Sequence, residues 1–312
     1  MSAIAYFCPG QGAQAVGMGV DLCAEFEVAR RTFEEADAAL GMGLATLCRE
    51  GPEEALTLTE NTQPALMATS VAVARVLEAE GGIVPTVAAG HSLGEWSAWV
   101  LVGALRFEEA IRAVRRRGQL MQEAVAPGVG AMSAVLGTDL ATVREMCTEA
   151  SQGDDELVVP ANVNGGGQIV VAGHEPAVAR LEELAAARKK RVSRLKVSAP
   201  FHSPLMAPAA EGLAPVLDAL VVSPPKAPVV TNVEAVPQSD PGRVAPLLRE
   251  QVTAPVRWEE CARAVAARSE SAIEVGPGRV LGGLMRRIDR GFTCRATGDV
   301  AGVRKVLEEL GS

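Results

Sequence analysis

The stretch Val87-Ala88-Ala89-Gly90-His91-Ser92-Leu93-Gly94-Glu95 decides the fold prediction for this chain. A short apolar run leads into Gly-His-Ser-Leu-Gly, and an apolar segment of helical character follows from Trp96. This order of strand, tight turn and helix is the context of a G-x-S-x-G nucleophile elbow, which exposes a serine Oγ. Gly90 and Gly94 keep Cβ atoms out of the crowded turn. The alternative is a helix-capping serine between two turn glycines, and the flanking strand and helix favour the elbow.

Length, charge and cysteine usage narrow the class of protein. A chain of 312 residues forms one large domain or two modest ones. The net charge of −8, without a long basic block, argues against a nucleic-acid partner. No apolar run approaches the roughly 20 residues of a membrane span, and residues 1–7 suggest a strand rather than a signal peptide. Six scattered cysteines predict reduced thiols in a cytoplasmic protein, and the absence of a Cys/His cluster argues against a metal site.

Strands and helices alternate on both sides of the elbow, a pattern typical of a parallel α/β sheet. A strand over 3–8 runs into a glycine-rich loop over 9–14 that does not complete a GxGxxG dinucleotide motif. Helical periodicity follows over 21–40, 65–80 and 107–125, and the second helix is predicted to be capped by residues 60–64 and to end at Gly81-Gly82. The C-terminal part predicts strands over 229–233, 272–275 and 294–297, and helices over 244–251, 258–268, 280–287 and 303–310.

Residues 128–197 have a different order of elements. They predict strand, helix, two strands around Gly165-Gly166-Gly167, helix and strand, which is the ferredoxin-like arrangement. The expected fold is therefore an α/β-hydrolase-like parallel-sheet core over 1–127 and 198–312, with an inserted ferredoxin-like (βαββαβ) subdomain over 128–197.

Two further residues stand in positions that suggest chemistry. Arg117 lies on the apolar face of the predicted helix over 107–125, together with Val114 and Met121. A buried arginine needs an anionic partner, which is either a protein carboxylate or a substrate. His202 is bracketed by Pro200 and Pro204 where the chain returns to the domain with the elbow. A histidine on such a stiff loop is what a Ser–His pair requires, although a lone histidine is more often structural.

Six ordered motifs resemble the family of malonyl-CoA:acyl carrier protein transacylases and the related acyltransferase domains of polyketide synthases. The resemblance covers essentially the whole chain. They are PGQGAQ at 9–14, NTQPA at 61–65, GHSLGE at 90–95, Arg117-Gly118, FHSPLM at 201–206 and EVGPG at 274–278.

The resemblance implies an enzyme that transfers a malonyl group from malonyl-CoA to the phosphopantetheine thiol of an acyl carrier protein, supplying fatty-acid synthesis. Ser92 would be the nucleophile and His202 its base, and the backbone N–H groups of Gln11 and Leu93 would hold the oxyanion. The backbone carbonyl of Gln251 would orient the histidine, and Arg117 would bind the malonyl carboxylate.

The same resemblance points to residues around the acyl group and to the partners. Met121 and Asn162 are expected at the acyl pocket, and Phe201 is the form associated with malonyl rather than methylmalonyl units. No cofactor is implied, because phosphopantetheine is carried by the partner protein. A basic edge over 189–196 is a candidate docking surface for the acidic carrier, with a solvated helix end as the alternative. A monomer without nucleic-acid or membrane partners is expected.

Three other functions differ in which of these residues they need. A free-standing acyltransferase of a polyketide pathway differs only in its carrier protein. A serine esterase or thioesterase would need Ser92 and His202 but not Arg117. A non-catalytic carrier-binding module would need none of the three.

Overall fold

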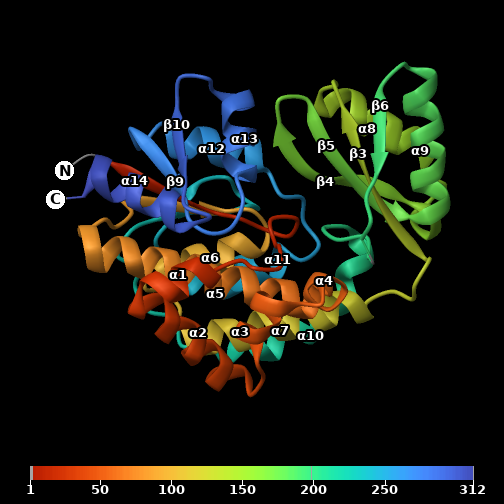
Figure 1. Cartoon of the computed structure of the whole chain (residues 1–312). Coiled ribbons are helices and arrows are strands. Elements are labelled where there is room, and N and C mark those ends of the chain that lie inside the picture. Colours follow the sequence, from red (N-terminus) through yellow and green to blue (C-terminus); the bar gives the residue numbers. More distant parts are fainter. Residues whose placement is uncertain (1–2, 198, 312) are drawn as a thin grey trace.

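The computed structural model describes residues 3–197 and 199–311 of the chain. Two separate sheets organise these residues (Figure 1). The larger has six strands, parallel except for its last pair. Its strands, in spatial order, are β10 (Thr293–Ala296), β9 (Ser271–Glu274), β1 (Ile4–Cys8), β2 (Val87–Gly90), β7 (Val229–Val230) and β8 (Pro237–Gln238).

Helices cover both faces of the larger sheet, as side-chain alternation along β1 requires. Tyr6 and Cys8 join the main core with the helices between β1 and β3, whereas Ala5 and Phe7 face α12 and α13. The helices of the first part are α1 (Val20–Glu25), α2 (Glu27–Leu40), α3 (Leu44–Glu50), α4 (Glu53–Thr57), α5 (Thr59–Gly81), α6 (Leu93–Leu101) and α7 (Phe107–Glu123). Those of the last part are η2 (Pro204–Met206), α10 (Ala207–Asp218), α11 (Pro241–Glu250), α12 (Trp258–Ala266), α13 (Val280–Ile288) and α14 (Val300–Leu310).

The second sheet is antiparallel and has its own core. Its spatial order is β4 (Val158–Gly165), β5 (Gln168–His174), β3 (Gly130–Leu136) and β6 (Arg191–Arg194), with α8 (Leu140–Ala150), η1 (Asp154–Glu156) and α9 (Glu175–Ala187) in the connections. Figure 1 shows it beside the α12–α13 side of the larger sheet. Asn162 in β4 pairs with Val256, which joins the two parts next to α12.

The alternation of strands and helices is confirmed, but several boundaries differ, and two of them have clear physical causes. The helix predicted over 21–40 is broken at Phe26, whose extended backbone separates α1 from α2 while its ring packs against the main core. The helix predicted from 65 begins at Thr59, so Pro64 lies within α5 rather than in a cap. Near a helix start a proline removes a single hydrogen bond, which burial can offset. The strand predicted over 229–233 is paired only at Val229 and Val230.

Other elements agree with the pattern or were not predicted. The end of α5 is confirmed, because Gly82 has the left-handed conformation expected of a helix stop. The turn Gly165-Gly166-Gly167 is also confirmed, with positive φ at all three glycines. Helix α10 had no counterpart in the sequence prediction. Its prolines and alanines give a weak periodic signal, and packing against α7 stabilises it.

Candidate active site

Ser92 lies in the turn between β2 and α6, at the carboxyl edge of the parallel sheet. Its φ of 52° and ψ of −109° belong to a region that residues with side chains rarely adopt. The turn is also crowded. A Cβ on Gly90 would stand 1.9 Å from the carbonyl carbon of Gly94, and one on Gly94 would stand 2.0 Å from the oxygen of Cys8. The two glycines are therefore steric requirements of the elbow.

The side chain of Ser92 is paired with that of His202. The Oγ and Nε2 atoms are 2.7 Å apart, and the Nδ1 of His202 lies 2.9 Å from the backbone oxygen of Gln251. A carbonyl can only accept, so Nδ1 carries the proton and Nε2 is left to accept from the serine hydroxyl. Burial lowers the pKa of His202 to about 3, and the positive charge of Arg117 acts in the same direction. The imidazole is thus a neutral acceptor poised on the hydroxyl.

Arg117 reaches the same point from α7. Its side chain is almost wholly buried, and burial lowers its pKa to about 10 although the charge of Glu95 opposes this shift. Nη1 donates to Oε1 of Gln63 at 2.8 Å, and Nη2 donates to Ser92 Oγ at 3.2 Å. Nη2 also donates to Oε1 of Gln251 at 3.1 Å.

The hydrogen-bond partners of Arg117 are all neutral, so they do not supply the anion that a buried arginine needs. Within residues 3–197 and 199–311, no carboxylate forms an ion pair with it, and its Nε has no hydrogen-bond partner. Glu95 acts on it only through its charge. A buried cation with a free donor beside the Ser92–His202 pair is suited to an anionic ligand.

Gln251 makes more contacts than the backbone carbonyl assigned to it from the sequence. Its Nε2 donates to the oxygen of Ser92 at 3.1 Å and to Oε2 of Glu95 at 2.8 Å. One residue therefore contacts Ser92, His202 and Arg117.

Three buried polar residues of the site were missed by sequence reasoning: Gln63, Glu95 and Asn232. Gln63 and Glu95 lie in motifs that were noted, but no role was assigned to them. Asn232 follows β7, and a polar residue after the carboxyl end of a parallel strand is a usable signal. The residue was missed because β7 is only two residues long, whereas the valines around Asn232 predicted a strand that continues past it.

The loop after β1 packs against the elbow. The N–H of His91 donates to the oxygen of Cys8 at 3.1 Å, and a Cβ on Gly10 would lie 2.4 Å from the oxygen of His91. This places Gln11, which is exposed, near the elbow. Within the described residues, the N–H groups of Gln11 and Leu93 have no hydrogen-bond acceptor.

The residues expected around the acyl group take different positions. Met121 lies beside the arginine, and its sulfur accepts from Nε2 of Gln63 at 3.8 Å. Phe201 is buried next to His202. Asn162 is buried in β4, and its role at the acyl pocket stays a prediction. Its neighbour Asn164 contacts the elbow directly, with Oδ1 2.8 Å from Nε2 of His91.

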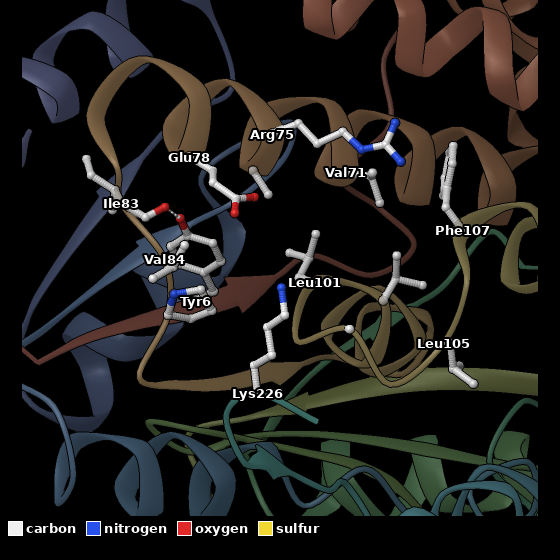
Figure 2. A pocket seen from close by; sticks show the side chains of 14 residues that line it. Tyr6, Val71, Arg75, Glu78, Ile83, Val84, Leu101, Leu105, Phe107 and Lys226 are labelled. Atoms are coloured by element: carbon white, nitrogen blue, oxygen red, sulfur yellow. Dashed lines mark hydrogen bonds between the residues drawn. The ribbon is translucent and has the colours of Figure 1, made fainter. Parts of the chain in front are cut away.

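Among the cavities beside the larger sheet, two differ in their relation to the site. One of about 300 Å³ reaches His202 between α8 and β4 of the small sheet and the segment around Pro255. The other, of about 240 Å³, contains no residue of the site. Tyr6, Lys226 and Leu101 are among its lining residues, and Figure 2 shows the hydroxyl of Tyr6 donating to the oxygen of Ile83.

No group of three or more His, Cys, Asp or Glu side chains that could hold a metal occurs among the residues that the structure describes. None of the helices in that part of the chain combines the length and apolar character needed to cross a membrane.

Comparison with known proteins identifies the family. Residues 5–291 match the acyl transferase domain family. The chain is 43% identical over 311 residues to the malonyl CoA-acyl carrier protein transacylase of Salmonella typhimurium, covering 99% of this chain and 100% of the relative. The chain therefore belongs to the malonyl-CoA:acyl carrier protein transacylase family within the acyl transferases.

Solved structures agree over the same length. An acyl carrier protein S-malonyltransferase from Vibrio cholerae superposes with a TM-score of 0.95 at 45% identity, covering 98% of this chain and all of that one. A malonyl-transacylase solved in complex with its type II PKS acyl-carrier protein gives a TM-score of 0.95 at 42% identity, covering 99% and 100%.

Proposed function

We propose that this chain transfers a malonyl group from malonyl-CoA to the phosphopantetheine thiol of an acyl carrier protein, through a malonyl ester on Ser92. One observation carries the proposal. The Oγ of Ser92 lies within hydrogen-bond distance of both a neutral imidazole, His202, and a buried guanidinium, Arg117. The oxygen of the proposed nucleophile thus contacts both the base and the cation that would bind the acyl carboxylate.

The reaction follows from this geometry in two half-reactions. Ser92 Oγ bonds to the thioester carbonyl carbon as its proton passes to Nε2 of His202. Collapse of the tetrahedral intermediate breaks the C–S bond, and the CoA sulfur leaves with the proton from His202. The carrier thiol then attacks the serine ester, gives its proton to His202, and the serine oxygen recovers a proton as the C–O bond breaks.

Two backbone donors are the proposed oxyanion hole. The N–H groups of Gln11 and Leu93 lie on the two segments that meet at the elbow and are free to donate. The N-terminus of α6 adds a favourable dipole at Leu93. These donors would act on the carbonyl oxygen as it gains charge.

Arg117 is the proposed carboxylate receptor. Malonyl carries a carboxylate, and the planar guanidinium can bind it with two hydrogen bonds. Its free Nε supports this role. Phe201 and Met121 would bound the acyl group, since one is adjacent to His202 and the other contacts Gln63. An esterase would have no use for this cation, so the transfer of an anionic acyl group is favoured over neutral-ester hydrolysis.

The two sheets are the proposed subdomains. The order β4-β5-β3-β6, with helices in the first and last connections, supports a ferredoxin-like insert over 128–197. The elbow at a parallel sheet supports an α/β-hydrolase-like core over 1–127 and 198–312. The boundary at residue 198 lies outside the described residues.

The basic edge of the insert is the proposed carrier-docking surface. Lys189, Arg191 and Lys196 are exposed and form no ion pair with any described residue, whereas Arg194 is paired with Glu175 and Glu182. Acyl carrier proteins are acidic, so free cations here would speed their encounter. Reversing Lys189 and Arg191 to Glu should raise the KM for the carrier and leave malonyl loading from malonyl-CoA unchanged.

Mass spectrometry tests the central proposal. After mixing with malonyl-CoA, the intact protein should gain one malonyl group that maps to Ser92 and disappears on addition of holo carrier protein. The S92A variant is the control. Absence of the adduct would contradict the enzyme, and loss of the adduct to water instead of the carrier would favour a thioesterase. Transfer to a fatty-acid carrier and to a polyketide carrier, compared side by side, assigns the pathway.

We also propose a cytoplasmic monomer. The six free cysteines support a reducing compartment. Light scattering during size-exclusion chromatography of the protein measures the oligomeric state.

A further inference from the structure

Asn232 holds the elbow from outside the elbow's own sequence. The residue is completely buried just beyond β7. Its Nδ2 donates to the oxygen of Gly90 at 2.7 Å, and its Oδ1 accepts from the N–H of Ser92 at 2.8 Å. One amide side chain therefore brackets the turn on both sides of His91.

Ser92 depends on such external partners because of where it stands. The strand β2 ends before it and α6 begins after it, so its N–H has no acceptor in either element. Its φ and ψ angles are disfavoured, and such a conformation persists only where the surroundings over-determine it. Asn232 satisfies the N–H, and Gln251 donates to the Ser92 oxygen. Both main-chain groups of the nucleophile are thus fixed by side chains from distant segments.

Glu95 joins these two segments. This fully buried residue accepts the N–H of Asn232 and the Nε2 of Gln251, both at 2.8 Å, on its Oε2. Gln251 in turn accepts from Nδ1 of His202. A displacement at Glu95 would therefore reach both members of the Ser–His pair, although no hydrogen bond joins the carboxylate to Ser92 Oγ or to His202.

We propose that Asn232 and Glu95 are positioning residues, a clamp that keeps Ser92 Oγ aimed at Nε2 of His202. The proposal rests on the assignment of Ser92 as the nucleophile. Neither residue need touch the acyl group. Loosening the clamp should slow attack by Ser92 and leave the KM for malonyl-CoA nearly unchanged, because Arg117 forms its hydrogen bonds with Gln63, Ser92 and Gln251 and not with Asn232 or Glu95.

The test compares N232A, E95A and E95Q with Y6F as a matched control. Y6F also removes a buried hydrogen bond, the one from the Tyr6 hydroxyl to the oxygen of Ile83, beside a cavity whose lining contains neither Ser92 nor His202 (Figure 2). Two readouts are used: the second-order rate of Ser92 labelling by a neutral fluorophosphonate, and kcat and KM for malonyl transfer. Circular dichroism and thermal unfolding give the folded fraction to which each rate is normalised.

We expect N232A and E95A to lower both the labelling rate and kcat by about tenfold or more, with KM within about twofold of the wild type. E95Q retains an oxygen that can accept both N–H groups, so it should recover most of the rate lost in E95A. N232D, which has the same shape and keeps the acceptor for Ser92, should be intermediate and covers the case in which N232A does not fold.

Two outcomes would overturn the clamp. One is wild-type labelling by folded N232D and E95A, which would leave these residues with a purely structural role. The other is an equal fall in labelling for Y6F. Because the fluorophosphonate carries no malonyl group, a clamp effect on labelling without any malonyl transfer would instead reject the proposed function alone.

Discussion

The Oγ of Ser92 and the Nε2 of His202 are 2.7 Å apart, and both residues have positive φ angles, 52° and 59°. Only two other non-glycine residues among those described, Lys189 and Ala235, share this property. Two of these four residues are therefore the pair whose alignment the proposed chemistry needs. Such conformations cost about 1–3 kcal/mol each and are retained where surrounding contacts impose them.

The strain at Ser92 predicts that glycine there stabilises the fold relative to alanine. The angles of Ser92 mirror the extended region, which glycine adopts without steric cost. Both S92G and S92A lose the hydroxyl, so their comparison isolates the backbone. S92G should exceed S92A in free energy of unfolding by about 1 kcal/mol in urea titrations, and neither should form a malonyl adduct. Equal stability of the two variants would show that the backbone of Ser92 is relaxed.

The packing of the elbow predicts that adding a side chain at Gly94 strongly destabilises the fold. A Cβ there would meet the backbone oxygen of Cys8 at 2.0 Å, so β1 and α6 would have to separate. G94A should lose roughly 2 kcal/mol or more in urea unfolding, together with malonyl loading. The matched control is G283A in α13, where a Cβ meets nothing within 4 Å and alanine should add about 0.5–1 kcal/mol. A neutral G94A would refute the close packing.

The place of Arg117 predicts selective loss of the anionic substrate. R117A should lower kcat/KM for malonyl transfer by about a hundredfold, the value of one strong charged hydrogen-bond pair. Hydrolysis of a short neutral ester at Ser92 should fall much less. R117K keeps the charge without the planar fork, so its kcat/KM for malonyl transfer should lie between those of R117A and the wild type. Equal losses of the two activities in R117A would contradict a carboxylate-binding role.

Glu95 predicts a pH dependence of stability. Burial raises its pKa from the usual 4.5 to about 7, although hydrogen bonds from Asn232 and Gln251 oppose the shift. The folded state therefore holds the proton more tightly than the unfolded state. Its stabilising effect is complete below about pH 4.5 and is lost as the pH rises through about 7.

Replacing Glu95 by glutamine should remove this loss. The free energy of unfolding of E95Q minus that of the wild type should rise between about pH 4.5 and 7, by a few kcal/mol at most, and level off above. His202 contributes in the opposite sense, since its lowered pKa costs stability as the pH falls below about 6.5, but it does so equally in both proteins. Urea titrations across pH 4–8 measure the difference. Parallel curves would mean that Glu95 does not titrate in this range.

The elbow could be predicted from sequence because its causes are local. Glycine at 90 and 94, an apolar run before them and a helical pattern after them determine the conformation of that segment whatever the rest of the chain does. The same holds for the helix over 107–125, whose period placed Arg117 on the buried face. The predicted helix boundaries were wrong near Phe26 and Pro64, where tertiary packing outweighed local preference.

The network around the serine could not be predicted in this way. Asn232 and Gln251 lie about 140 and 160 residues beyond Ser92 in the chain, and only the order of β2 and β7 and the packing of α11 bring them together. The sequence by itself determined the turn that exposes Ser92 and the helix face that carries Arg117, because bonded neighbours and residue periodicity decide those. The tertiary structure alone decided which distant amides and carboxylate hold them, because hydrogen bonds depend on distances that chain order does not encode.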